Sequence, residues 1–200
     1  MDPEHYYVDL AEAYLRGMGD KPEQEGLRLH RFKRTAMLPR VRRVLGVLRA
    51  FAPKTIVDIG SGRGVFLWPL LDEFDEVQVV ATDLAQHRLA HVAAVRRGGV
   101  ERLHTTRANA CNLPLANDAV DMVTALEVLE HLENPGAAAR ELIRVARTAV
   151  VVSVPSKADD NPEHIQLFNK DSLTELLTVA GARSVNIDYV LNHIVAVATV

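Results

Sequence analysis

A short apolar run that ends in three closely spaced glycines constrains the fold of this chain more than any other feature. Residues 55–60 read TIVDIG, and Gly62 and Gly64 follow before the pattern becomes helical. A strand that runs through glycines into a helix brings backbone N–H groups close to a ligand, because no side chain obstructs the approach. The segment therefore predicts the first strand of an α/β sheet, with a ligand at its carboxyl end.

Short apolar runs and helical patterns follow one another along the rest of the chain, which is typical of a sheet built from β-α units. Strands are expected at 55–60, 77–83, 103–108, 120–126 and 149–155. Helices are expected at 64–74, 85–97, after Asn134 and Pro135, and at 171–180. Residues 184–190 and 193–200 are too close in sequence for a crossover helix, so they should pair as an antiparallel hairpin. The prediction is a Rossmann-like α/β fold: an open sheet of about seven strands, mostly parallel, with helices on both faces.

Length and composition favour one domain over residues 1–200. The chain has 200 residues, of which 48% are hydrophobic, enough for a sizeable core. Residues 1–51 read as helical, with Leu38, Val41, Leu45 and Leu48 at helical spacing, and we expect them to form a cap over the substrate pocket. The segment from Gly26 to Val57 contains no acidic residue and several Arg and Lys, so it would suit an anionic substrate or form a solvated helix face.

Other features of the sequence indicate a cytoplasmic protein without a membrane partner. Cys111 is the single cysteine, so no internal disulfide can form. The first residues are acidic where a secretory signal would be basic, and no apolar run is long enough to span a membrane. The sequence does not indicate an oligomeric state.

An acidic residue follows the second expected strand. Asp83 ends the run VVATD, at a position where a carboxylate can accept hydrogen bonds from both hydroxyls of a ribose. It could also cap the helix that follows. The glycine spacing before it departs from the G-x-G-x-x-G pattern of dinucleotide-binding turns, which argues against a nicotinamide cofactor.

Taken together, VDIGSGRG, ATD and RANACNLPLANDAVDMVTALEVLEHL resemble the class I S-adenosylmethionine-dependent methyltransferases, in particular their broad small-molecule group. The resemblance runs from about residue 52 to the C-terminus. It implies that S-adenosylmethionine is the cofactor and that Asp83 holds its ribose, with Leu84 packed on the adenine. It also implies that three glycines line the methionine and ribose part, namely Gly60, Gly62 and Gly64.

The same resemblance assigns the adenine end to the segment after the third strand. Asn109 stands where an acid is common in the family, and its side-chain oxygen can still accept from the adenine amino group. The backbone N–H of Ala110 could meet a ring nitrogen. The remaining expected cofactor contacts flank these segments: Asp58, Ser61, Leu126 and Glu127.

Carboxylates and imidazoles follow the fourth expected strand. In LEVLEHL, a helix would place Glu127, Glu130 and His131 on one face, and His164 should return to the same end of the sheet. This E-x-x-E-H motif with a later histidine is similar to the small-RNA terminal 2'-O-methyltransferases, where it binds a metal. The alternatives are a turn that only closes the strand, and a metal-free general base. We expect no metal and take His131, His164 and Glu130 as the catalytic candidates.

The expected activity is methyl transfer to a small-molecule acceptor, and the basic segment before the first strand would suit an anionic one. The alternatives are a metal-dependent RNA 2'-O-methyltransferase, for which nucleic acid would be the partner, and a cofactor-binding module without catalysis. Aromatic and basic residues before the first strand are candidates for acceptor contact, although aromatics in a leading helix also pack in cores: Tyr6, Tyr7, Tyr14, His30 and Arg31. Trp68 and Phe74 are expected in the core.

Overall fold

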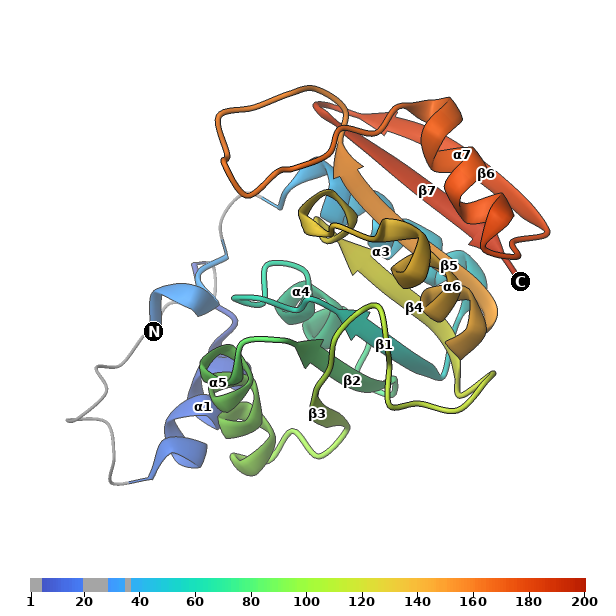
Figure 1. Ribbon diagram of the computed structural model, residues 1–200. Coiled ribbons are helices and arrows are strands. Elements are labelled where there is room, and N and C mark those ends of the chain that lie inside the picture. Colours follow the sequence, from blue (N-terminus) through green and yellow to red (C-terminus); the bar gives the residue numbers. More distant parts are fainter. Residues whose placement is uncertain (1–4, 20–28, 35–36) are drawn as a thin grey trace.

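The computed structural model describes residues 5–19, 29–34 and 37–200. Its centre is a seven-stranded sheet with the strand order β3-β2-β1-β4-β5-β7-β6 (Figure 1). The strands are β1 Thr55–Ile59, β2 Gln78–Asp83, β3 Leu103–Arg107, β4 Val120–Leu126, β5 Ala146–Pro155, β6 Ser184–Val190 and β7 His193–Thr199.

Strand directions match the fold class expected from the sequence. Strands β1 to β5 pair in parallel, whereas β7 is antiparallel to both β5 and β6. The chain order reverses at β1, which lies between β2 and β4. A crevice opens at such a reversal beyond the carboxyl ends of the strands, and ligands of open α/β sheets bind there.

Helices cover both faces of the sheet and divide its core in two. They are α1 Val8–Met18, α3 Pro39–Phe51, α4 Leu67–Glu73, α5 Gln86–Arg97, α6 Pro135–Val145 and α7 Lys170–Val179, with 3-10 turns η1 Leu29–Phe32 and η2 Leu129–His131. Alternate residues of β5 face opposite cores: Val151 belongs to the core that includes residues of α3 and α4, and Val152 to the core that includes residues of α6 and α7. Both strand faces are therefore apolar, as expected for a sheet covered on both sides.

The N-terminal helices pack against the helices and strands of the main fold, and the expected cap over a substrate pocket stays a prediction. Helix α1 lies against α5 so closely that a Cβ at Gly17 would stand 1.7 Å from the carbonyl oxygen of Ala94. Helix α3 contacts β6 and β7. The stretch around η1 borders one cavity together with Tyr7, Met37 and Leu38, and Arg40 and Val41 of α3 line another; both cavities are described below. Part of the 1–51 segment lies outside the described residues.

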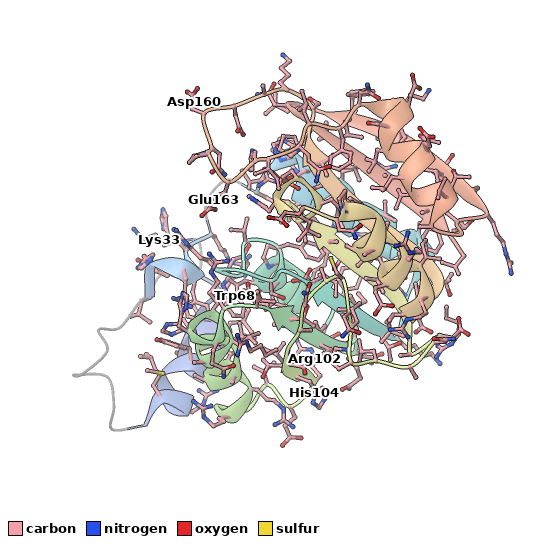
Figure 2. The ribbon with its side chains drawn as sticks, in the orientation of Figure 1. Lys33, Trp68, Arg102, His104, Asp160 and Glu163 are labelled. Atoms are coloured by element: carbon pink, nitrogen blue, oxygen red, sulfur yellow. The ribbon has the colours of Figure 1, made fainter. Side chains whose placement is uncertain are left out.

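Aromatic residues between these helices fill the core. Trp68 is 1% exposed and lies in the interior, whereas Asp160 projects from the loop after β5 (Figure 2). Tyr14 is fully buried between Phe32 and His91, and its hydroxyl is 3.1 Å from His91 Nδ1. The expected acceptor contact through Tyr14 is therefore wrong for this structure, because the ring is enclosed by core residues. Within the described chain, no helix has the length and apolar character needed to cross a bilayer.

Candidate active site

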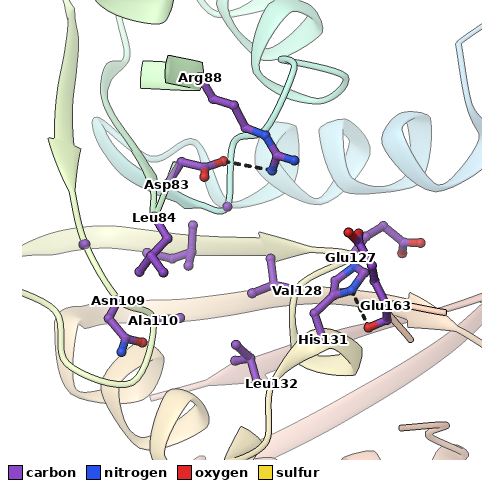
Figure 3. A pocket seen from close by; sticks show the side chains of 13 residues that line it. Asp83, Leu84, Arg88, Asn109, Ala110, Glu127, Val128, His131, Leu132 and Glu163 are labelled. Atoms are coloured by element: carbon purple, nitrogen blue, oxygen red, sulfur yellow. Dashed lines mark hydrogen bonds and ion pairs between the residues drawn. The ribbon is translucent and has the colours of Figure 1, made fainter. Parts of the chain in front are cut away.

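Two adjoining cavities lie at the carboxyl ends of the central strands. The larger has a volume of about 550 Å³ and extends from Asp83 and Leu84 to His131 and Glu163 (Figure 3). The smaller, of about 220 Å³, lies beside the glycine turn. Three residues line both: Gly60, Arg88 and Glu127. All cofactor residues expected from the sequence line one of the two, with the exception of Gly64.

The glycine turn after β1 is held by backbone conformation and by its neighbour strand. Gly60 and Gly62 have φ values of 68° and 54°, in the left-handed region that favours glycine. The Ser61 N–H donates to the carbonyl of Thr82 at 2.9 Å, which ties the turn to β2. Its hydroxyl donates to the carbonyl of Asp58 at 3.1 Å. The turn is thus fixed with its backbone exposed toward the smaller cavity.

Asp83 joins the glycine turn after β1 to the turn after β2. Its Oδ2 accepts the Gly62 N–H at 3.0 Å, and its Oδ1 accepts the Ala85 N–H at 2.8 Å. Arg88 approaches Oδ2 at 3.6 Å (Figure 3). Helix α5 has Ala85 at its N-cap without a side-chain cap, so Asp83 braces the turns before the helix rather than capping it. Its carboxylate lines the larger cavity, where a ribose could meet it.

Leu84 and the Asn109 segment form the far end of the larger cavity. Leu84 is 58% exposed although it is apolar, which suits a side chain that covers a flat aromatic ring. Asn109 and Ala110 line the wall that follows β3. The side-chain oxygen of Asn109 already accepts the Cys111 N–H at 2.9 Å. One lone pair of that oxygen remains for a ligand donor.

Gly64 differs from the other two glycines. Its φ is 87°, and a Cβ there would stand 2.1 Å from the Trp68 ring. Trp68 in turn donates its Nε1–H to the carbonyl of Arg63 at 3.0 Å. Gly64 lines neither of these two cavities but borders a third, so its expected contact with the cofactor stays a prediction. Its small size serves the packing of Trp68.

Asp58 lies buried beneath the glycine turn. Its Oδ1 accepts the Thr124 hydroxyl at 2.8 Å, which joins β1 to β4. Burial raises the pKa of Asp58 to about 6, although its hydrogen bonds act in the opposite direction, and the nearby Asp83 charge adds to the rise. The carboxyl group is thus a polar contact inside the core, at the floor of the smaller cavity.

Glu127 belongs to a network that joins four elements. It has a φ of 56° directly after β4. Its Oε1 accepts the Ser153 hydroxyl at 2.9 Å and lies 3.8 Å from Arg40 Nε, and its Oε2 lies 3.1 Å from His193 Nε2. The expected helical face shared by Glu127, Glu130 and His131 is wrong, because the positive φ turns the chain before η2 begins at Leu129. Glu127 lines both cavities and so stands near the expected methionine end.

Glu130, His131 and His164 come together without Glu127. Their ligand atoms all lie within 4.8 Å of one another, and the two imidazole centroids are 4.8 Å apart. Glu130 is fully buried, and neither carboxylate oxygen has a hydrogen-bond partner among the described residues. Burial raises the pKa of Glu130 to about 8, with the charge of Glu127 adding to the rise. The three side chains form a polar cluster next to the larger cavity, which His131 lines.

The acceptor candidates of the N-terminal segment border a third cavity of about 220 Å³. Tyr7, His30 and Arg31 line it, together with Gly64 and Arg63 of the glycine turn. Tyr7 packs under the guanidinium of Arg34 at 4.5 Å, and burial raises its pKa. Tyr6 is bridged to Lys33 and does not line this cavity.

Several cavity residues escaped the sequence analysis. Arg88 comes from α5 and pairs with Asp83, and Glu163 comes from the loop after β5. Val128 packs against Gly60, so that a Cβ on residue 60 would lie 2.7 Å from Cγ2 of Val128. Arg40 belongs to the basic segment of residues 26–57, whose composition does not single it out. The contacts of Val128 with Gly60 and of Arg40 with Glu127 join residues far apart in sequence, so no local pattern indicates them.

Comparison with known proteins identifies the domain. A family model described as a methyltransferase domain matches residues 57–153. A probable S-adenosylmethionine-dependent methyltransferase of Mycobacterium tuberculosis is 35% identical over 114 residues, covering 52% of this chain and 40% of that protein. This chain contains a class I S-adenosylmethionine-dependent methyltransferase domain. Its cofactor is accordingly S-adenosylmethionine, as the sequence predicts.

This chain is also similar to a fungal O-methyltransferase in sequence and to a bacterial methyltransferase in structure. An O-methyltransferase of Pyrenophora dematioidea is 28% identical over 167 residues, covering 76% of this chain and 62% of that protein. Among solved structures, a SAM-dependent methyltransferase from Aquifex aeolicus has a TM-score of 0.64 at 19% identity, covering 80% of this chain and 96% of that one. The structural likeness confirms the fold. The chain spans about two fifths of the length of the mycobacterial relative.

Proposed function

We propose that this protein transfers the methyl group of S-adenosylmethionine to a small-molecule acceptor. The observation that carries the proposal is the pair of adjoining cavities around Gly60, which are lined by the expected cofactor residues. The sulfonium of the cofactor supplies an activated methyl group, so the protein has chiefly to align a nucleophile with it. The volume of about 550 Å³ is in the range of small-molecule sites.

Each end of the larger cavity has a distinct task in this proposal. Asp83 accepts hydrogen bonds from the ribose hydroxyls, and Leu84 covers the adenine. The glycine turn and Glu127 hold the methionine part. The acceptor then enters from the side of His131, because that residue lines the cavity away from the adenine end. Arg40 and Arg88 line the smaller cavity, which supports an acceptor or cofactor group with negative charge.

Calorimetric titration of the full chain with S-adenosylmethionine tests the cofactor half of the proposal. We expect one site, and we expect Asp83→Ala to raise the Kd at least tenfold, because hydrogen bonds to a charged group contribute about 1.5–3 kcal/mol. Asp75→Ala is the matched control, since Asp75 is exposed and lines neither cavity. A thermal melt of each variant shows that the fold is intact. Full-strength binding by Asp83→Ala, or tighter binding of NAD, would contradict the proposal.

A screen of small hydroxylated, amine and carboxylate acceptors tests the transfer half. Release of S-adenosylhomocysteine, with the methylated product found by mass spectrometry, is the expected result. Turnover of RNA but of no small molecule would favour the nucleic-acid alternative. Cofactor binding without turnover of any acceptor would favour a non-catalytic module. The relatives described above support neither alternative.

A further inference from the structure

Three side chains outside the expected cofactor contacts form a second constellation beside the larger cavity. Glu130 and His131 belong to η2, and His164 belongs to the loop after β5. The loop is held in place by two backbone bonds, from Ile165 N–H at 3.0 Å and Gln166 N–H at 3.3 Å, both to the Glu130 carbonyl. These bonds to the Glu130 backbone therefore hold His164 in place beside the Glu130 side chain.

Both imidazoles are oriented through the same ring atom. His131 Nδ1 lies 2.9 Å from the carbonyl oxygen of Glu163, and His164 Nδ1 lies 2.8 Å from Asp159 Oδ1. Each partner is an acceptor, so each Nδ1 carries the proton and donates it. The Nε2 of each ring is then left with a lone pair. A histidine whose Nδ1–H is held by a carbonyl or a carboxylate is the usual arrangement around a metal ion.

Glu130 supplies the negative charge. Its carboxylate is fully buried, and both oxygens lack a hydrogen-bond partner among the described residues. A buried carboxylate without donors is costly unless a cation or a proton compensates it. Arg40 carries a positive charge that acts on Glu130 through space, but its ion pair is with Glu127, at 3.8 Å. Both oxygens are therefore free to ligate a cation held between them and the two imidazoles.

We propose that Glu130, His131 and His164 bind one divalent transition-metal ion through two Nε2 atoms and one carboxylate oxygen. Two imidazoles and a carboxylate suit Zn²⁺, Co²⁺, Mn²⁺ or Fe²⁺ and leave further coordination positions open. The ligand atoms lie within 4.8 Å of one another. Small side-chain rotations close this to the separations of about 3.3 Å that metal–nitrogen bonds near 2 Å require.

The position of the ion gives it a role toward the acceptor. His131 lines the larger cavity, and His164 lines a separate cavity of about 220 Å³ together with Lys157 and Asp159. An ion between them binds acceptor oxygens at its open positions, which favours acceptors with two neighbouring oxygen donors. This role rests on the proposed function, whereas the metal site itself does not.

Metal titration of the untagged, chelator-treated full chain tests the site without using methyl transfer. We expect Co²⁺ to bind with a stoichiometry of one and to give visible absorption bands typical of nitrogen and oxygen ligation. Glu130→Gln and His164→Asn should each weaken Co²⁺ binding at least tenfold, and Asp159→Asn about 10–100-fold, because Asp159 orients His164. Zn²⁺ should displace Co²⁺. Mg²⁺ should bind more weakly, since it prefers oxygen ligands alone.

Matched variants separate the site from nonspecific binding. Glu133→Gln and His87→Asn change exposed residues of the same types and should leave the Co²⁺ affinity unchanged. Each variant should keep the wild-type affinity for S-adenosylmethionine, which shows that it folds. Absence of Co²⁺ binding below millimolar concentration would overturn the proposal, as would equal affinity in Glu130→Gln and His164→Asn. Failure of the proposed function would appear instead as loss of S-adenosylmethionine binding in the wild type.

Discussion

At the scale of single residues, the glycine turn combines two different requirements. Gly60 and Gly62 have positive φ values and line the smaller cavity, and Gly62 also donates its N–H to Asp83. Gly64 needs the absence of a side chain, because the Trp68 ring occupies the space where a Cβ would project. One short motif therefore serves ligand approach at its start and core packing at its end.

The Gly64→Ala variant tests this division. A Cβ 2.1 Å from the Trp68 ring, at a φ of 87°, must displace the indole or the turn. We expect a loss of about 2–4 kcal/mol in the free energy of unfolding, from strain and overpacking together. Urea denaturation measures it. Gly46→Ala in α3 is the control: its Cβ meets open space, and an unchanged or slightly higher stability is expected.

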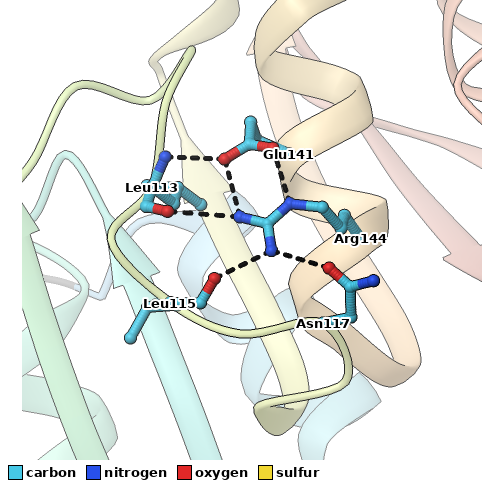
Figure 4. A network of polar contacts seen from close by, with 5 residues as sticks. All are labelled: Leu113, Leu115, Asn117, Glu141 and Arg144. Carbon is cyan, nitrogen blue, oxygen red and sulfur yellow. Dashed lines mark hydrogen bonds and ion pairs between the residues drawn. The ribbon is translucent and has the colours of Figure 1, made fainter.

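At the scale of elements, a polar network joins the loop between β3 and β4 to α6 (Figure 4). Arg144 donates to the carbonyls of Leu113 and Leu115 at 3.2 and 2.8 Å, and to Asn117 Oδ1 at 2.9 Å. Glu141 pairs with Arg144 at 2.6 Å and accepts the Leu113 N–H at 2.6 Å. The hydrogen bond with Arg144 is the main reason why the pKa of Glu141 is lowered. The loop that carries Asn109 and Ala110 is therefore anchored to α6.

Replacing Arg144 by Gln tests whether this anchor matters for cofactor binding. Loss of the guanidinium removes the donors to the loop, so we expect about 1–2 kcal/mol lower stability and a two- to tenfold higher Kd for S-adenosylmethionine. Thermal melts and calorimetry measure the two effects. Arg140→Gln, an exposed arginine on the same helix, should change neither quantity. An unchanged Kd in Arg144→Gln would mean that the loop keeps its shape without the anchor.

At the scale of the whole molecule, the sheet gathers the turns that follow its parallel strands at one edge. The turn after β1 supplies the glycines, β2 ends in Asp83, β3 leads to Asn109 and β4 to Glu127. The loop after β5 adds Glu163. Several carboxyl groups near this edge are buried, namely those of Asp58, Asp83 and Glu130. The free energy of unfolding of the whole molecule therefore depends on pH.

Asp58 makes the folded state less stable as the pH rises. Its pKa rises from 3.8 to about 6 on folding, so between these values the folded state binds more protons than the unfolded state. The contribution of Asp58 is therefore most favourable below pH 4 and is lost as the pH rises to 6. A shift of this size corresponds to about 3 kcal/mol. Relative to wild type, Asp58→Asn should gain that amount in unfolding free energy between pH 4 and pH 7.

Asp121 provides the contrasting variant in the same measurement. Burial alone would raise its pKa, but the N–H groups of Lys54 and Thr55, the Thr55 side chain and the charge of Arg147 lower it overall. Asp121→Asn should therefore lose stability relative to wild type as the pH rises, opposite in sign to Asp58→Asn. Urea unfolding at a series of pH values measures both. Parallel slopes for the two variants would contradict the assignment.

The sequence by itself determined the strand order along the chain, the antiparallel ending, the glycine turn and the position of Asp83, because periodicity and turn chemistry are local properties. Only the tertiary structure decided that Glu127 turns toward Arg40 and His193, and that Glu130 instead meets His164. The positive φ of Glu127 fixes the first direction. The second is fixed by the loop after β5, which bonds to the Glu130 carbonyl from more than thirty residues further along the chain. Such contacts depend on how packed elements meet, and that information is absent from any short stretch of sequence.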